Sequence, residues 1–166
     1  DYTKTILYPS STSNAFSYQD GYSTQPVLTN GVGYWLKFNG AQNVQMTGLL
    51  RTEETIIVSE GWNMIGSISS AVPVATIVEV PSGIVASSYF GYDEGYFLAE
   101  TIEPGKAYWV KTNGGGLLVM SSSVARLASL TGEQEKEDAQ TPNSIIIEPQ
   151  SVIAKAKARR NHERRG

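Results

Sequence analysis

The 166-residue chain contains no cysteine and only one histidine, His162. Because there is no thiol, neither a disulfide nor a thiolate metal site can form. The histidine lies in a charged carboxy-terminal stretch, so the preceding residues offer no histidine cluster for a metal and no Ser-His-Asp arrangement. These absences exclude thiolate metalloproteins and a Ser-His-Asp triad within the repeated part of the chain.

Charge and long apolar runs are also scarce. Charged residues make up 17% of the chain, and its net charge is −3. No apolar run reaches the roughly 18 residues that a membrane-spanning helix requires, and no charged-then-apolar signal segment opens the chain. We therefore predict no membrane span, and the chain is either intracellular or a processed product.

Glycine, tyrosine and tryptophan are well represented, with 16, nine and three residues. Such a balance is typical of twisted sheets with many tight turns. Two stretches repeat each other without a gap at a separation of 74 residues: from Phe16 to Gly40, ten of 25 positions are identical to their counterparts in 90–114. Similarity at a fixed period indicates tandem copies of one structural unit.

Both copies contain the same two turn patterns. Gln19-Asp20-Gly21 and Asp93-Glu94-Gly95 predict hairpin loops in which the glycine takes the left-handed conformation. Thr29-Asn30-Gly31 and Glu103-Pro104-Gly105 predict type II bends, because glycine accepts the positive φ required at the second central position. The turns therefore predict corresponding hairpins and bends in the two copies.

Strands are expected around these turns. The strands at 33–38 and 106–112 each place tryptophan and lysine on one face. Residues 44–50 and 117–121 are expected to return beside them, and residues 2–8 to form a first strand. Two more strands are expected on either side of Glu60-Gly61.

The predicted fold class is all-β, with two tandem β-sandwich-like repeat units and a carboxy-terminal extension. The first unit, residues 1–52, is expected to be incomplete at its N-terminal side, because nothing like Gly61-Trp62-Asn63 precedes it. The second unit comprises residues 53–122. Residues 123–166 are predicted to be a linker, a docking strand and a short basic helix.

Three motifs carry a family resemblance: Gly61-Trp62-Asn63-Met64-Ile65-Gly66, then Tyr92-Asp93-Glu94-Gly95-Tyr96, then Ile102 to Lys111. In order and spacing they resemble the GWNLI…GY…PG.AYWVK modules of secreted and cell-surface proteins of the Bacteroidetes, Ignavibacteria and Chlorobi, which are associated with type IX secretion. The similarity covers one full module, about 55–120, and the later half of another, about 2–50. The resemblance implies an extracellular β-rich module without established catalytic activity, repeated within a longer surface polypeptide.

No set of residues in the repeated part predicts catalysis. The adjacent carboxylates Asp93 and Glu94 lie at a predicted hairpin tip, where a turn residue is the favoured interpretation and a calcium site a minor alternative. The glycine-rich run 113–116 lacks the Lys-Ser/Thr of a phosphate-binding loop. We therefore expect no enzyme activity and no cofactor.

The repeated aromatic residues have two interpretations. They can build the core and cross-strand pairs of each unit, which is the favoured interpretation because they recur at corresponding positions. Alternatively, they form a face that contacts a partner or stacks on a sugar, with lysine stems lying over the rings. The candidate contact residues are Trp35, Trp109, Tyr22, Tyr96, Lys37 and Lys111.

The leading functional hypothesis is a non-catalytic extracellular or cell-surface structural module, a subunit of a surface or filamentous assembly that uses strand exchange. An incomplete unit exposes a strand edge, and such edges accept strands from other chains. The candidate docking strand is Ser144, Ile145, Ile146, Ile147 and Glu148. The alternative is a carbohydrate-binding or adhesion module of a larger secreted protein, so the expected partners are further copies, other surface subunits or a polysaccharide. The basic residues of 155–165 are not expected to bind a specific nucleic acid, because no aromatic residue interleaves them.

Overall fold

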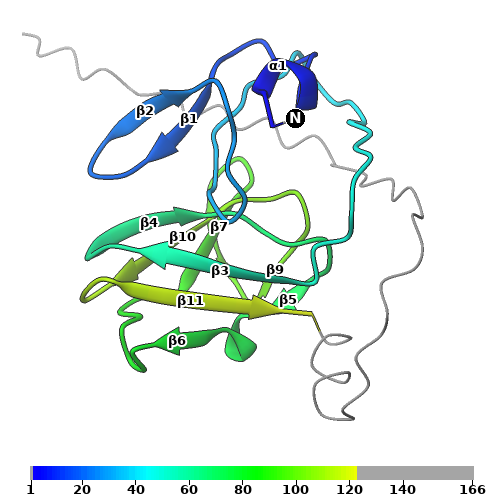
Figure 1. The fold of residues 1–166 in the computed structure, drawn as a ribbon. Helices are drawn as coiled ribbons and strands as arrows, with labels where there is room; N and C mark the ends of the chain where they lie inside the picture. The colour runs from blue at the N-terminus through cyan, green and yellow to red at the C-terminus, as the bar shows by residue number, and fades with distance from the viewer. Residues whose placement is uncertain (1, 123–166) are drawn as a thin grey trace, which may run out of the picture.

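The computed structural model describes residues 2–122, and within them the fold is all-β, as predicted (Figure 1). The helical elements in this part are a single turn, α1 (Lys4–Leu7), and a short 3-10 turn at Val74–Thr76. The strands are β1 (Ala15–Tyr18), β2 (Tyr22–Gln25), β3 (Glu53–Val58), β4 (Gly61–Ile65), β5 (Val72–Pro73), β6 (Val78–Val80), β7 (Tyr89–Tyr92), β8 (Tyr96–Ala99), β9 (Thr101–Ile102), β10 (Tyr108–Thr112) and β11 (Gly116–Ser121). We call residues 2–50 the first copy and residues 53–122 the second copy of the repeated sequence.

The second copy contains two facing sheets. One has the strand order β4-β10-β7-β8 and the other the order β3-β11-β6, both antiparallel. β3 and β4 follow each other in the chain but belong to different sheets, so together they form a β-arch that links the two layers (Figure 1). Gly61 begins β4 with φ 96°, a conformation that favours glycine.

The hydrophobic core lies between these two sheets. The inward side chains alternate along β3, β7, β10 and β11, as expected for a sheet with one solvated face. β3 contributes Ile56 and Val58, β4 contributes Ile65, and β11 contributes Leu118 and Met120, all at most 5% exposed. The β3–β4 arch therefore supplies a substantial part of the core of the second copy.

The side chain of Asn63 fixes the arch. Its Nδ2 donates to the Ser59 carbonyl at 2.8 Å and to Thr112 Oγ1 at 3.2 Å, while its Oδ1 accepts from the Ser59 N–H at 3.0 Å. Thr112 is 1% exposed and donates in turn to the Ser59 carbonyl at 2.6 Å. These bonds satisfy the polar groups at the tip of the arch, where no ladder partner is present.

The two predicted hairpin loops adopt the same backbone. β1 pairs with β2 and β7 with β8, in registers that match at the 74-residue separation. The left-handed residue in each loop is the acidic one, Asp20 or Glu94, both with φ 53°, so the prediction that glycine occupies this position is wrong. The reason is that the N–H of Gln19 donates to the carbonyl of Gly21 at 3.0 Å, which closes the loop around Asp20 and forces the positive φ there.

The two predicted bends are confirmed. Gly31 and Gly105 have φ of 76° and 74°. In each bend a tyrosine hydroxyl accepts a hydrogen bond from the first backbone N–H: Thr29 N–H to Tyr34 and Glu103 N–H to Tyr108, both at 2.9 Å. The correspondence between the copies thus extends to side-chain hydrogen bonds.

The first copy departs from three strand predictions. Residues 33–38 form only isolated bridges, at Trp35 and Phe38, rather than a strand. Residues 2–8 contain α1 rather than a strand, and residues 44–50 form no regular element. In the second copy the counterparts of the last two segments, β6 and β11, pair with each other, and β11 is held on its other side by β3. Among residues 2–122, the first copy has no counterpart of β3. These residues therefore lack the neighbouring strand with which they would pair.

Within residues 2–122, no helix is long and apolar enough to cross a membrane. The predicted docking strand and basic helix lie outside the described residues. The division of the chain at residue 52 stays a prediction.

Candidate functional site

The two copies contact each other reciprocally through aromatic rings. Tyr18 packs edge-on against Trp109 with ring centroids 4.8 Å apart, and its counterpart Tyr92 packs in the same way against Trp35 at 5.4 Å. When residue i of one unit contacts residue j of the other and the reverse also holds, the two are related by an approximate twofold axis. The copies therefore correspond in their contacts as well as in their backbones.

The candidate aromatic contact residues fall into two groups. Trp35 and Trp109 lie in the contact between the copies, and their indole Nε1 atoms are buried without a hydrogen-bond partner. Tyr22 and Tyr96 are exposed, at 58% and 62%. The structure thus places the tryptophans where they join the copies and the tyrosines where a partner can reach them.

The hydroxyl of Tyr96 lies among neighbouring aromatic groups. Burial is the main cause that raises the pKa of the Tyr96 hydroxyl. The neighbouring Tyr22 and Tyr92 raise this pKa further, whereas the Trp109 indole lowers it. The Tyr96 hydroxyl and the Trp109 indole are nevertheless not aligned for a hydrogen bond, so Trp109 Nε1 has no hydrogen-bond partner among residues 2–122. Tyr22 is therefore near enough to the Tyr96 hydroxyl to act on it electrostatically.

The two candidate lysines have equivalent positions at exposed strand ends. The backbone N–H of Lys37 donates to Ser13 Oγ and that of Lys111 to Ser87 Oγ, each at 2.9 Å. Both side chains are exposed and, within residues 2–122, neither forms an ion pair. They are therefore accessible but are not assembled into a charged site.

The most unusual feature of the described chain is an unpaired strand edge in the first copy. Trp35 exchanges backbone hydrogen bonds with Phe16 at 2.9 and 3.1 Å, so the N–H and C=O groups of Tyr34 and Leu36 point to the opposite side. In the second copy the equivalent groups of β10 pair with β4. Among residues 2–122, the backbone groups of Tyr34 and Leu36 have no hydrogen-bond partner. We call residues 34–38 the open edge.

A second unpaired segment lies next to the open edge. Within residues 2–122, residues 40–50 make no hydrogen bond. Two of their apolar side chains, Val44 and Met46, correspond to Leu118 and Met120 of β11, which are fully buried. The segment keeps the inward apolar alternation of a strand but lacks the pairing.

A groove of about 780 Å³ runs along these segments. Burial raises the pKa of Tyr8, which lines the groove and packs edge-on against Phe38 at 6.2 Å. The rest of the apolar lining comes from both copies and includes Tyr34, Leu36, Val44, Met46 and Ala107. The groove thus combines apolar side chains with unpaired backbone donors and acceptors.

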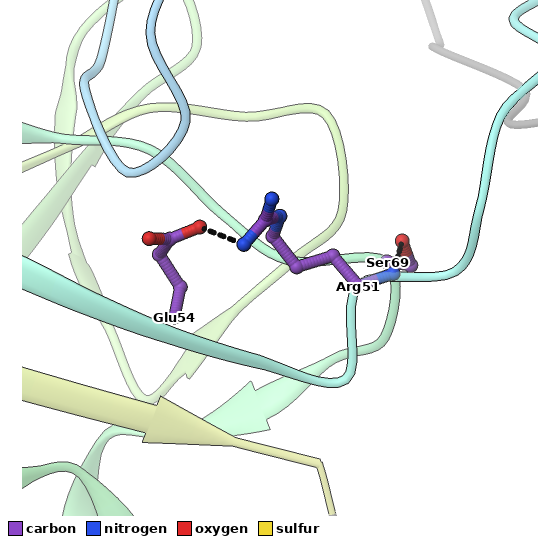
Figure 2. Close-up of polar contacts among 3 residues, drawn as sticks. All are labelled: Arg51, Glu54 and Ser69. Atoms are coloured by element: carbon purple, nitrogen blue, oxygen red, sulfur yellow. Dashed lines mark hydrogen bonds and ion pairs between the residues drawn. The ribbon is translucent and has the colours of Figure 1, made fainter.

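Arg51 and Ser69 line one part of the groove, and Glu54 of β3 contacts Arg51 there (Figure 2). Arg51 exchanges hydrogen bonds with Ser69: its N–H donates to Ser69 Oγ at 2.9 Å, and its carbonyl accepts from the Ser69 N–H at 3.0 Å. Its guanidinium forms an ion pair with the largely buried carboxylate of Glu54, with 2.9 Å between Arg51 Nη1 and Glu54 Oε2, although the two atoms are not aligned for a hydrogen bond. The 40–50 segment is therefore tied down immediately after its last residue.

The groove presents unpaired backbone groups together with apolar side chains. Among residues 2–122, no group of three or more acidic or histidine side chains is placed to hold a metal ion. A row of free N–H and C=O groups beside apolar side chains is the arrangement by which sheets bind extended peptides. The site can therefore hold polypeptide backbone.

Comparison of the chain with protein-family models, with curated proteins and with solved structures finds no match.

Sequence reasoning predicted an open strand edge in the first unit and named Trp35 and Lys37 as contact residues, but it did not name Tyr34, Leu36 or Met46. The signal was present, because Tyr34, Leu36 and Met46 correspond to Tyr108, Val110 and Met120. The three residues of the second copy are at most 1% exposed, whereas those of the first copy are only partly buried. The site therefore consists of core-type residues in a unit that lacks a strand.

Proposed function

We propose that the protein is a non-catalytic assembly module that joins other polypeptide chains by accepting a β-strand along the open edge. The observation that carries the proposal is the row of unpaired backbone groups at Tyr34 and Leu36, beside an apolar groove. Main-chain hydrogen bonds supply affinity in such strand addition, and side-chain pockets supply specificity. The module therefore acts as an acceptor of strands.

An exposed strand edge of this kind pairs with other chains unless it is protected. Natural sheets blunt exposed edges with charge, proline or bulges, because a free edge templates pairing with other chains. The open edge contains Tyr34, Leu36 and Phe38 and has one charged residue, Lys37. Its composition favours pairing, which supports a role in assembly.

The proposed location is the cell surface or the outside of the cell. The support is the resemblance of the Gly61-Trp62-Asn63 motif and its two companion motifs to modules of secreted surface proteins. A structural subunit of a surface or filamentous assembly fits an acceptor edge combined with the absence of a metal cluster among the described residues.

The proposal predicts that a single strand of the β4 type binds to the open edge. A fluorescently labelled peptide with the sequence of residues 60–67 is expected to bind the full-length chain, measured by fluorescence anisotropy. Leu36→Glu places a carboxylate where it must be desolvated on pairing, so it is expected to raise the dissociation constant at least about tenfold.

The matched control is Thr24→Glu, which adds the same charge on an exposed residue of β2. It is expected to leave peptide binding unchanged, and circular dichroism checks that both variants are folded. Absence of binding to the wild-type chain, or equal binding by the Leu36→Glu variant, would contradict the proposed function.

A second candidate function is carbohydrate binding by the exposed tyrosines. The favouring observation is that Tyr22 and Tyr96, 58% and 62% exposed, lie close together on the surface. Aromatic rings with a polar edge suit sugar stacking. If this function holds, the Tyr22→Ala and Tyr96→Ala variants lose binding on a glycan array while keeping the thermal stability of the wild-type chain; an array without any signal for the wild-type chain rules it out.

A further inference from the structure

We infer that the groove receives a two-stranded β-arch of the β3–β4 type, carried by another polypeptide chain, rather than a single strand. This inference rests on the proposed function and specifies its partner. The arch is expected to place one strand on the open edge and the other on residues 42–47. The chain itself holds the pattern for such an occupant, because β3 and β4 fill the equivalent place in the second copy.

The first argument is the matched geometry of the acceptor. The open edge and β10 share the same bend, the same tyrosine hydroxyl bond at 2.9 Å and the same serine bond to a lysine N–H at 2.9 Å. β10 pairs with β4 over its whole length, from Tyr108 opposite Ile65 to Thr112 opposite Gly61. An edge built in the same way presents its donors and acceptors to an occupant of the same shape.

The second argument concerns the other strand of the arch. β3 pairs with β11 along six residues, from Glu53 opposite Ser121 to Val58 opposite Gly116. The counterpart of β11 is the stretch 42–47, which keeps the inward residues Val44 and Met46 but makes no hydrogen bond within residues 2–122. A single strand on the open edge leaves this stretch unpaired, whereas an arch pairs both.

The third argument is a contact that β4 already makes across the copies. Beyond its pairing with β10, its end reaches the first copy: the Gly33 N–H donates to the Met64 carbonyl at 3.0 Å, and the Gly66 N–H donates to the Gly31 carbonyl at 2.8 Å. Under the approximate twofold relation the equivalent groups are the Ala107 N–H and the Gly105 carbonyl. Both line the groove, and neither has a partner among residues 2–122.

Two differences between the copies define how the occupant departs from β3–β4. Phe38 stands in the place of Thr112, so the occupant meets an apolar ring where Asn63 binds a hydroxyl. Ala107 stands in the place of Gly33, where a Cβ would come within 2.8 Å of the Ile65 carbonyl oxygen, so the end of the occupant must shift outward relative to β4. An apolar residue near the arch tip and a small residue at its end are therefore expected.

The test uses the full-length chain and a synthetic peptide with the sequence of residues 52–67. Hydrogen exchange followed by mass spectrometry reports each acceptor segment separately. On addition of the peptide, amide exchange is expected to slow at least about tenfold in both 34–38 and 42–47, because both become hydrogen-bonded. The peptide of residues 60–67 is expected to protect 34–38 alone and to bind at least about tenfold more weakly.

Four results would overturn the inference. Equal affinity of the long and short peptides, with protection confined to 34–38, means that a single strand is the occupant, and the proposed function then still stands. Protection that survives Leu36→Glu means that the peptide enters elsewhere, for example by displacing β4. Protection of 34–38 in the chain without peptide that is lost on Ile146→Asp means that the docking strand of the chain itself covers the edge. Failure of both peptides to bind removes the proposed function as well.

Discussion

Replacement of Met120 by alanine is expected to lower the free energy of unfolding by about 2–5 kcal/mol. Met120 lies on β11 between the two sheets of the second copy and is 0% exposed. Truncation removes the buried apolar atoms and leaves a cavity that the neighbouring β-branched and aromatic side chains fill only in part. Urea unfolding followed by circular dichroism measures the change, with the m-value checked for constancy.

The chain supplies its own matched control for this substitution. Met46 is the counterpart of Met120 in the first copy, has the same side chain, and is only partly buried beside the groove. Met46→Ala is expected to cost less than about 1 kcal/mol. Equal losses at the two positions would show that the first copy has a packed core, and the open groove would then be wrong.

Replacement of Gly33 by alanine is expected to cost about 1–3 kcal/mol, through overpacking rather than a cavity. A Cβ at this position would lie 2.8 Å from the Ile65 carbonyl oxygen, 2.8 Å from Met64 Cγ and 2.9 Å from the Cβ of Ala107. The first of these is backbone and the last belongs to the other copy, so the substitution forces the copies apart along their contact. Thermal and urea unfolding of the full-length variant measure the loss.

Gly48→Ala is the control for this prediction. No atom lies within 4 Å of a Cβ built at Gly48, and its φ is not positive. The variant is expected to keep the wild-type stability within about 0.5 kcal/mol. If Gly33→Ala is as harmless as Gly48→Ala, β4 does not join the two copies as described, and the contact on which the arch inference draws is lost.

Local patterns predicted the two bends and the main strands of the second copy. Glycine at a type II bend requires a positive φ, and Gly31 and Gly105 show it. The strands on either side of Glu60 and the strand that returns at 117–121 form as the alternation indicates, with β11 at Gly116–Ser121. Such predictions succeed because the hydrophobic alternation and the turn residues agree with the pairing that tertiary structure then provides.

The same patterns were insufficient in the first copy. Residues 44–50 alternate like 117–121 but form no strand, and residues 2–8 contain the single turn α1. A strand is defined by its neighbour, so the same alternation gives a strand beside β3 and an unpaired segment where no such neighbour is placed. Tyr34, Leu36 and Met46 were not named as site residues for this reason: they look like core residues, and only their missing partner makes them part of a site.

The sequence alone determined that this is an all-β chain with two corresponding sets of turns, because the special φ values and the alternation of apolar residues are local properties. It also excluded thiolate chemistry, because no cysteine is present. Tertiary structure decided that the tryptophans join the copies, that β3 and β4 form an arch between two sheets, and that the backbone of Tyr34 and Leu36 is left without a partner. These features depend on which segments lie side by side. Whether a strand has a pairing partner far away in the chain cannot be read from the strand's own residues.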